Sequence, residues 1–122
     1  MENNMFTAMV IQGEQFARVL GFPTANLAIP PKILNLDDGV YAALTIIDNV
    51  FYNSALIISR DGEKVEVHVL DQDLDLYGKE IAVQYLSFIC PIIPCSGKTT
   101  LKSVVIFAIE KVRSFFDSYH SN

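Results

Sequence analysis

Residues 40–58 read VYAALTIIDNVFYNSALII, which is two apolar, β-branched runs separated by the pair Asp48-Asn49. A two-residue break of this chemistry between strand-forming runs is typical of a tight β-hairpin, because Asn and Asp tolerate the backbone conformations of a hairpin turn. Strands joined in this way pair antiparallel. A second turn signal, at residues 60–63, ends the second run, so a further strand is expected after it.

Three other segments have the pattern of strands. Along residues 65–69, valine alternates with polar side chains, so that one face is apolar and the other carries Glu66 and His68. Residues 5–12 alternate in the same way, and residues 81–89 form an apolar run that prolines end. Several short strands in succession favour a mainly β protein.

The hydrophobic period becomes helical near residue 101. From there the apolar residues fall on one stripe, which contains Leu101, Val104, Val105, Ala108, Val112, Phe115, Phe116 and Tyr119. Strands followed by a terminal helix, without a repeated βαβ pattern, predict an antiparallel barrel or sandwich against which the helix packs. We expect one domain over residues 1–122, with the barrel at about 5–95 and the helix at about 99–119.

The composition argues against several classes of protein. The net charge of −5 disfavours a nucleic-acid-binding surface, because phosphate binding depends on clustered Lys and Arg. The apolar runs end well short of the roughly 18 residues that a membrane span requires, and the first residues lack the pattern of a signal peptide. We therefore expect a cytoplasmic protein with no membrane partner, in which Cys90 and Cys95 are reduced structural thiols.

Residues 21–27 read GFPTANL and form the first candidate site. Pro23 restricts its own backbone and that of the preceding residue, which shapes the chain where Thr24 and Asn26 offer oxygen atoms. Such oxygens suit magnesium, which takes few protein ligands and fills its shell with phosphate oxygens and water. The alternative is a loop in which the Thr and Asn side chains only cap the backbone.

Glu66 is the second candidate, because a carboxylate on a rigid strand can act as a base toward an alcohol. The alternative is that Glu66 and His68 face water. The third candidate, residues 73–79, reads DLDLYGK and predicts an acidic turn closed by Gly78, with Tyr77 packing at its base. Its spacing does not match a calcium-binding EF-hand.

Residues 96–100 read SGKTT, which looks like the end of a phosphate-binding P-loop. A P-loop requires a glycine five residues before the Gly-Lys pair, and Ile92 stands there instead. Pro94 also removes an amide donor of the kind that a phosphate cradle uses. A helix cap at Ser96 or Thr99 explains this segment better.

Taken together and in this order, these motifs resemble the riboflavin kinase family, whose kinase domain also forms the C-terminal end of bacterial bifunctional FAD synthetases. The resemblance covers roughly residues 9–113. It rests on Gly13, LGFPTANL at 20–27, GVYA at 39–42, VEVHVLD at 65–71 and DLYGK at 75–79. It implies a six-stranded antiparallel barrel of Greek-key type with a C-terminal helix, and an enzyme that phosphorylates riboflavin with ATP and magnesium to give FMN.

The resemblance also implies roles for individual residues. Thr24 and Asn26 match the residues that hold magnesium, or another divalent cation, and the ATP phosphates. Glu66 matches the base that takes the proton from the riboflavin 5′-hydroxyl. The positions implied for nucleotide binding are Gly13, Arg18, Gly21, Pro23, Thr24, His68, Tyr77 and Gly78.

The expected partners are riboflavin or FMN and ATP or ADP, with the chain a monomer. The family usually carries a glycine-rich loop of the form Gly-x-Gly-Arg-Gly before the Leu-Gly pair, whereas this chain has Gly13 and Arg18 with EQFA between them. A second hypothesis is therefore a non-catalytic module that binds flavin or nucleotide through a barrel with a degenerate phosphate flap.

Overall fold

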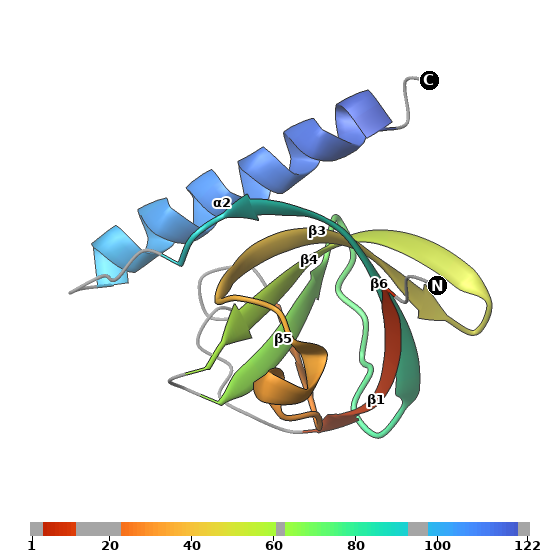
Figure 1. Ribbon diagram of the computed structural model, residues 1–122. Coiled ribbons are helices and arrows are strands. Elements are labelled where there is room, and N and C mark those ends of the chain that lie inside the picture. The colour runs from red at the N-terminus through yellow and green to blue at the C-terminus, as the bar shows by residue number, and fades with distance from the viewer. Residues whose placement is uncertain (1–3, 12–22, 61–62, 93–97, 120–122) are drawn as a thin grey trace.

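Six strands close into a barrel, and a long helix lies against its outer side (Figure 1). The structure is a computed structural model that describes residues 4–11, 23–60, 63–92 and 98–119. The strands are β1 (Met5–Ile11), β2 (Ala25–Leu27), β3 (Gly39–Ile47), β4 (Val50–Ser59), β5 (Lys64–Val69) and β6 (Glu80–Cys90). A short 3₁₀ helix covers Pro31–Leu34, and the terminal helix α2 covers Lys98–Tyr119.

Around the barrel the strands follow the order β1-β2-β5-β4-β3-β6, and every pair is antiparallel. Strands β3, β4 and β5 are consecutive neighbours, and β6 returns to lie beside β3, which is the Greek-key arrangement. The predicted antiparallel barrel with a C-terminal helix is thus confirmed.

The hairpin predicted at Asp48-Asn49 joins β3 to β4. Ile47 and Val50 are paired, and the two residues between them have φ angles of 51° and 68°. Two successive positive φ angles are the mark of a type I′ turn, whose twist matches that of the flanking strands. The hairpin sets the register of β3 and β4 over nine residue pairs, from Gly39↔Ile58 to Ile47↔Val50.

Strand β2 was missed by the sequence patterns, which predicted a loop for residues 21–27. It is three residues long and pairs with β1 through Val10↔Leu27 and with β5 through Ala25↔Val67. A strand this short does not reveal a period of two. It nevertheless closes the barrel, and it carries Asn26 on a strand rather than on a free loop.

The barrel interior is filled mainly by aliphatic side chains. Those most deeply buried include Leu56, Ile58, Val65, Val67, Ile81 and Val83. Thr45 and Ser54 are also buried, and the Thr45 hydroxyl donates a hydrogen bond of 2.8 Å to Ser54 Oγ. This bond satisfies the two polar groups inside an apolar core, where an unpaired hydroxyl would be costly.

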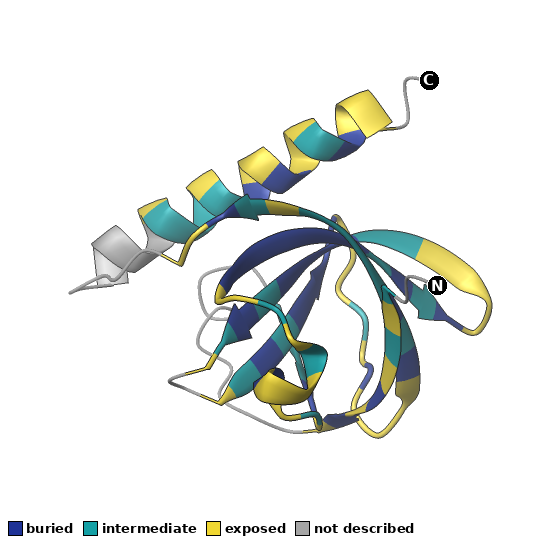
Figure 2. Cartoon of the chain, in the orientation of Figure 1, coloured by how far each residue is buried: buried dark blue, intermediate teal, exposed yellow. Residues whose placement is uncertain are grey.

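Helix α2 covers the outer side of the barrel at β3, β4 and β6 (Figure 1), with its buried face turned to the strands (Figure 2). Ile109, Val112 and Phe116 are buried there, beside Ala42 and Ala55 of the strands. The helical period was therefore predicted correctly in outline. The expected stripe omitted Ile109, and it included Tyr119, which is exposed because it lies at the last turn of the helix.

The start of α2 corrects one prediction. The helix begins at Lys98, so Thr99 lies within its first turn and is not the residue before it. Ser96, the other expected cap, and Cys95 lie outside the described residues, whereas Cys90 is a free, buried thiol at the end of β6. Within the described part of the chain, no helix has both the length and the apolar character needed to cross a membrane.

Candidate functional site

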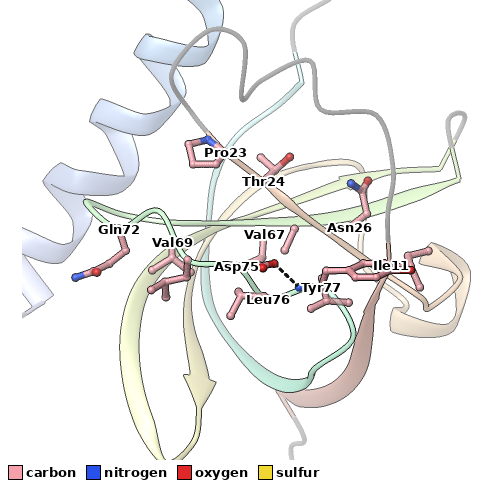
Figure 3. Close-up of a pocket in the computed structure, with 13 residues that line it drawn as sticks. Ile11, Pro23, Thr24, Asn26, Val67, Val69, Gln72, Asp75, Leu76 and Tyr77 are labelled. Carbon is pink, nitrogen blue, oxygen red and sulfur yellow. Dashed lines mark hydrogen bonds between the residues drawn. The ribbon is translucent and has the colours of Figure 1, made fainter.

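A cavity of about 280 Å³ opens where β1, β2 and β5 meet the segment between β5 and β6 (Figure 3). Its walls combine apolar strand residues with polar groups from β2 and from the connecting segment. The lining residues are Val10, Ile11, Pro23, Thr24, Ala25, Asn26, Val67, Val69, Gln72, Leu74, Asp75, Leu76 and Tyr77. The cavity therefore brings together two motifs that lie about fifty residues apart in the sequence, residues 23–26 and 75–77.

Thr24 and Asn26 project from one short segment of the cavity wall, above the loop that carries Asp75 and Tyr77 (Figure 3). Asn26 is fixed by its place on β2, where it pairs with Ile11 of β1 and with Glu66 of β5. A hydroxyl and an amide oxygen are hard donors that suit a magnesium ion.

Thr24 and Asn26 supply at most two protein ligands to such an ion. Among the residues that the structure describes, no group of three or more His, Cys, Asp or Glu side chains could hold a metal. An ion bound at Thr24 and Asn26 would therefore take its remaining ligands from phosphate oxygens and water, as magnesium does at phosphate-transfer sites. The residues present fit magnesium in company with a phosphate ligand.

Glu66 stands directly opposite Asn26 in the β2–β5 pair. Opposite residues of an antiparallel pair project to the same face of the sheet, with Cβ atoms roughly 5 Å apart. Glu66 and Asn26 therefore share the outer face of the barrel, while Val65 and Val67 point into the core. Glu66 is half-buried, so the alternative in which its side chain simply faces water is only partly consistent with the structure.

His68 does not face water. Its side chain is only 5% exposed, and its Nδ1 lies 2.7 Å from the carbonyl oxygen of Pro23. Because a carbonyl can only accept, Nδ1 carries the proton and donates it. The bond joins β5 to the segment that leads into Thr24, so His68 contributes to the placement of the first candidate motif.

Burial favours the neutral form of the His68 side chain. Burial lowers the pKa of His68 below its ordinary value, and the Arg113 guanidinium lowers it further. The hydrogen bond to Pro23 and the Asp71 carboxylate act in the opposite direction. A neutral imidazole is compatible with the polar but largely desolvated position that it occupies between β5 and the segment at Pro23.

The segment at residues 75–79 is a compact turn. Asp75 Oδ1 accepts a hydrogen bond of 3.3 Å from the Tyr77 amide, and the Gly78 amide donates to Val10 O at 2.9 Å. Gly78 has a φ of 84°, a conformation that side-chain-bearing residues rarely adopt. Leu76 is the buried residue of this turn, whereas Tyr77 is 65% exposed at the cavity rim, which corrects the expectation that Tyr77 packs at its base.

Three of the expected nucleotide-binding positions, Gly13, Arg18 and Gly21, lie outside the described residues. Sequence reasoning also missed part of the cavity wall, including Val10, Ile11 and Gln72. These residues have no chemical motif. They become neighbours only because β2 closes the barrel beside β1 and β5.

Comparison with known proteins places this barrel in a class of small-molecule kinases. The family model described as "Flavokinase: Riboflavin kinase" matches residues 2–116. The chain therefore belongs to the riboflavin kinase family.

Two curated relatives agree with this placement. The "Trifunctional protein RibF/MnmA" of Mycoplasmoides gallisepticum is 31% identical over 113 residues, which are 88% of this chain and 17% of the relative. The "Bifunctional riboflavin kinase/FMN adenylyltransferase" of Mycoplasma pneumoniae is 30% identical over 110 residues, 88% of this chain and 41% of the relative. The chain thus spans less than half the length of these relatives.

The structure of riboflavin kinase from Trypanosoma brucei superposes with a TM-score of 0.63, over 93% of this chain and 79% of that chain. Its sequence is 19% identical, so this likeness supports the fold alone.

Proposed function

We propose that the chain is a riboflavin kinase that transfers the γ-phosphate of ATP to the 5′-hydroxyl of riboflavin, giving FMN and ADP. The observation that carries the proposal is the pairing of Asn26, which lines the cavity together with Thr24, with Glu66 on the neighbouring strand. This arrangement sets oxygen donors for a metal-bound phosphate beside a carboxylate that can accept a proton. Family membership supports the same reaction class.

In this proposal the cavity receives the nucleotide. Thr24 and Asn26 would hold magnesium, or another divalent cation, together with the ATP phosphates, and the ion would neutralise charge on those phosphates. Tyr77 and Gly78 border the nucleotide, and His68 and Pro23 fix the segment that carries Thr24. Gly13, Arg18 and Gly21 are assigned to the phosphates from the family resemblance.

Glu66 is the proposed general base. It accepts the proton of the riboflavin 5′-hydroxyl as that oxygen forms a bond to the γ-phosphorus, while the bond from the γ-phosphorus to the bridging β,γ-oxygen breaks and ADP leaves. Most of the rate enhancement in such a transfer comes from positioning and charge neutralisation, so the fixed strand position of Glu66 suits the role.

The experiment is to incubate the folded chain with riboflavin, ATP and a series of divalent cations, and to separate FMN from riboflavin by chromatography. Time-dependent FMN formation that requires both ATP and a divalent cation is the expected result. Folded protein that forms no FMN with any cation contradicts the proposal. Binding of FMN or Mg-ADP in calorimetry without turnover would favour the non-catalytic module instead.

A further inference from the structure

An ion pair links α2 to the segment that follows β5. Arg113 Nη1 lies 2.7 Å from Asp71 Oδ2 and 3.0 Å from Asp71 Oδ1. The two side chains are 45% and 69% exposed, so the pair stands in contact with solvent. It lowers the pKa of Asp71 and raises that of Arg113, and both residues are therefore charged at neutral pH.

Asp71 lies where the chain leaves β5 and enters the segment that lines the cavity. It lies between Val69 and Gln72, both of which line the cavity. The Leu70 amide donates to Asn53 O at 2.9 Å, which ties the end of β5 to β4, and Asp71 then turns the chain with a φ of 62°. The ion pair therefore joins α2 to the chain at the point where it leaves β5 and enters the cavity wall.

A second, open cavity of about 650 Å³ is lined in part by residues 70–72 of the same turn. Asp71 and Arg113 are part of its lining, and Gln72 lines both cavities. The turn at residues 70–72 thus contributes to both cavities. Movement of Asp71 toward or away from α2 would be transmitted to the nucleotide side through Gln72, its neighbour in the chain.

We propose that Arg113 is a positioning residue for nucleotide binding, which acts through Asp71 to hold residues 72–77 in the geometry that forms the cavity wall. The inference rests on the proposed function, because it takes this cavity to be the nucleotide site. Arg113 itself does not line that cavity, and the ion pair is the direct contact that joins it to the chain leading into residues 72–77.

The competing explanation is an ordinary surface ion pair that only stabilises the fold. Exposed pairs contribute little to global stability, because water and salt screen them. A stabilising pair would leave ligand affinity unchanged once the protein is folded. A positioning pair would change affinity at constant folding, and a lysine at position 113 would restore part of the effect because it keeps the charge.

The test measures Mg-ADP affinity by calorimetry, KM for ATP, kcat and melting temperature in the full chain and in four variants. They are Arg113→Gln, Arg113→Lys, Asp71→Asn and the double variant Asp71→Asn/Arg113→Gln. Lys111→Gln is the matched control, because it removes an exposed positive charge from the same helix and leaves the pair of Arg113 with Asp71 in place.

We expect Arg113→Gln and Asp71→Asn each to weaken Mg-ADP binding and raise KM for ATP by about two- to five-fold, with kcat nearly unchanged. The double variant should bind Mg-ADP no more weakly than either single variant does, since each single variant already removes the same interaction. Arg113→Lys should bind better than Arg113→Gln, and the ratio of variant to wild-type affinity should approach one at about 1 M salt. Lys111→Gln should bind Mg-ADP as the wild type does.

Additive effects in the double variant, or equal affinity in all proteins, would overturn the inference while leaving the proposed function standing, provided that the wild type forms FMN. A wild type that binds no Mg-ADP at this cavity would overturn both. The two failures are therefore distinguishable in the same set of measurements.

Discussion

His68 shows how one buried side chain connects the strand that carries Glu66 with the segment that carries Thr24. Its hydrogen bond to Pro23 spans 45 residues of sequence, and its burial lowers its pKa. In the unfolded chain a histidine has a pKa of about 6.5. Below that pH the unfolded state binds the proton more readily than the folded state does, so protonation favours unfolding.

The first prediction follows from this preference of the unfolded state for the proton. The contribution of His68 to the free energy of unfolding should be present above about pH 6.5 and should be lost as the pH falls through the folded-state pKa. Urea unfolding between about pH 7.5 and pH 5 should therefore show a steeper loss of stability in the wild type than in His68→Gln. Carboxylates titrate in both proteins and cancel in the comparison. Parallel pH profiles would show that His68 has no such linkage.

The second prediction concerns Glu66. Replacing it with Gln keeps its size and removes the proton acceptor, so turnover should fall by roughly 10²- to 10⁴-fold, or about 3 to 5 kcal/mol of barrier. Folding and Mg-ADP affinity should change little, because Glu66 is not part of the cavity lining. The measurements are kcat for FMN formation, ADP affinity and melting temperature.

Glu80→Gln is the control for that experiment. Glu80 is also a strand glutamate, but it is exposed at the start of β6, where it pairs with Met9 of β1. Its replacement should leave turnover unchanged. Near-normal turnover in Glu66→Gln would remove Glu66 from the mechanism.

At the scale of elements, the β3–β4 hairpin depends on two residues with positive φ. Asn49 has a φ of 68°, and a residue without an Asn or Gly side chain pays roughly 1–2 kcal/mol to adopt this conformation. The third prediction is that Asn49→Ala lowers the free energy of unfolding by about 1 kcal/mol, while Asn49→Gly is neutral or stabilising. Equal losses in the two variants, measured by urea unfolding, would mean that the turn conformation is not the cause.

Elements with a clear period were predictable from the sequence, and those fixed by distant partners were not. The β3–β4 hairpin, the alternating strand at 65–69 and the terminal helix follow from local pattern and turn chemistry. Strand β2 is too short to have a pattern, and the burial of His68 depends on a carbonyl group far away in the sequence. Local signals carry no information about either.

The same distinction applies to the residues of the candidate site. Thr24, Asn26 and Tyr77 were found because their motifs are chemically distinctive, and the structure brings all three to one cavity. Gln72 lies in a polar segment without a motif, and its place between two cavities arises from the turn at Asp71. The binding and catalytic roles of the candidate site residues remain predictions.

At the scale of the whole molecule, two apolar clusters hold the chain together. One fills the barrel, and the other lies between the barrel and α2. The fourth prediction is that Val112→Ala, at a fully buried position of α2, lowers the free energy of unfolding by about 2 kcal/mol because it removes packed methyl groups and leaves a small cavity.

Phe107→Ala provides the control on the same helix. It deletes more atoms than Val112→Ala does, but from an exposed side chain that contacts the Lys111 ammonium group. Its cost should stay below about 1 kcal/mol. A larger loss for Phe107→Ala than for Val112→Ala in urea unfolding would mean that α2 is not held by its buried face.

The shortness of β2 has a consequence for the dynamics of the barrel. Among the residues that the structure describes, two residue pairs join this strand to β1 and two join it to β5, whereas β3 and β4 share nine. The described part of the sheet therefore has few strand-to-strand hydrogen bonds beside Thr24 and Asn26. Amide hydrogens there should exchange with solvent through local opening long before the amide hydrogens of β3 and β4 do. A ligand that binds both side chains would slow this exchange, so that isotope uptake by one short strand would report occupancy of the site even in a protein that performs no chemistry.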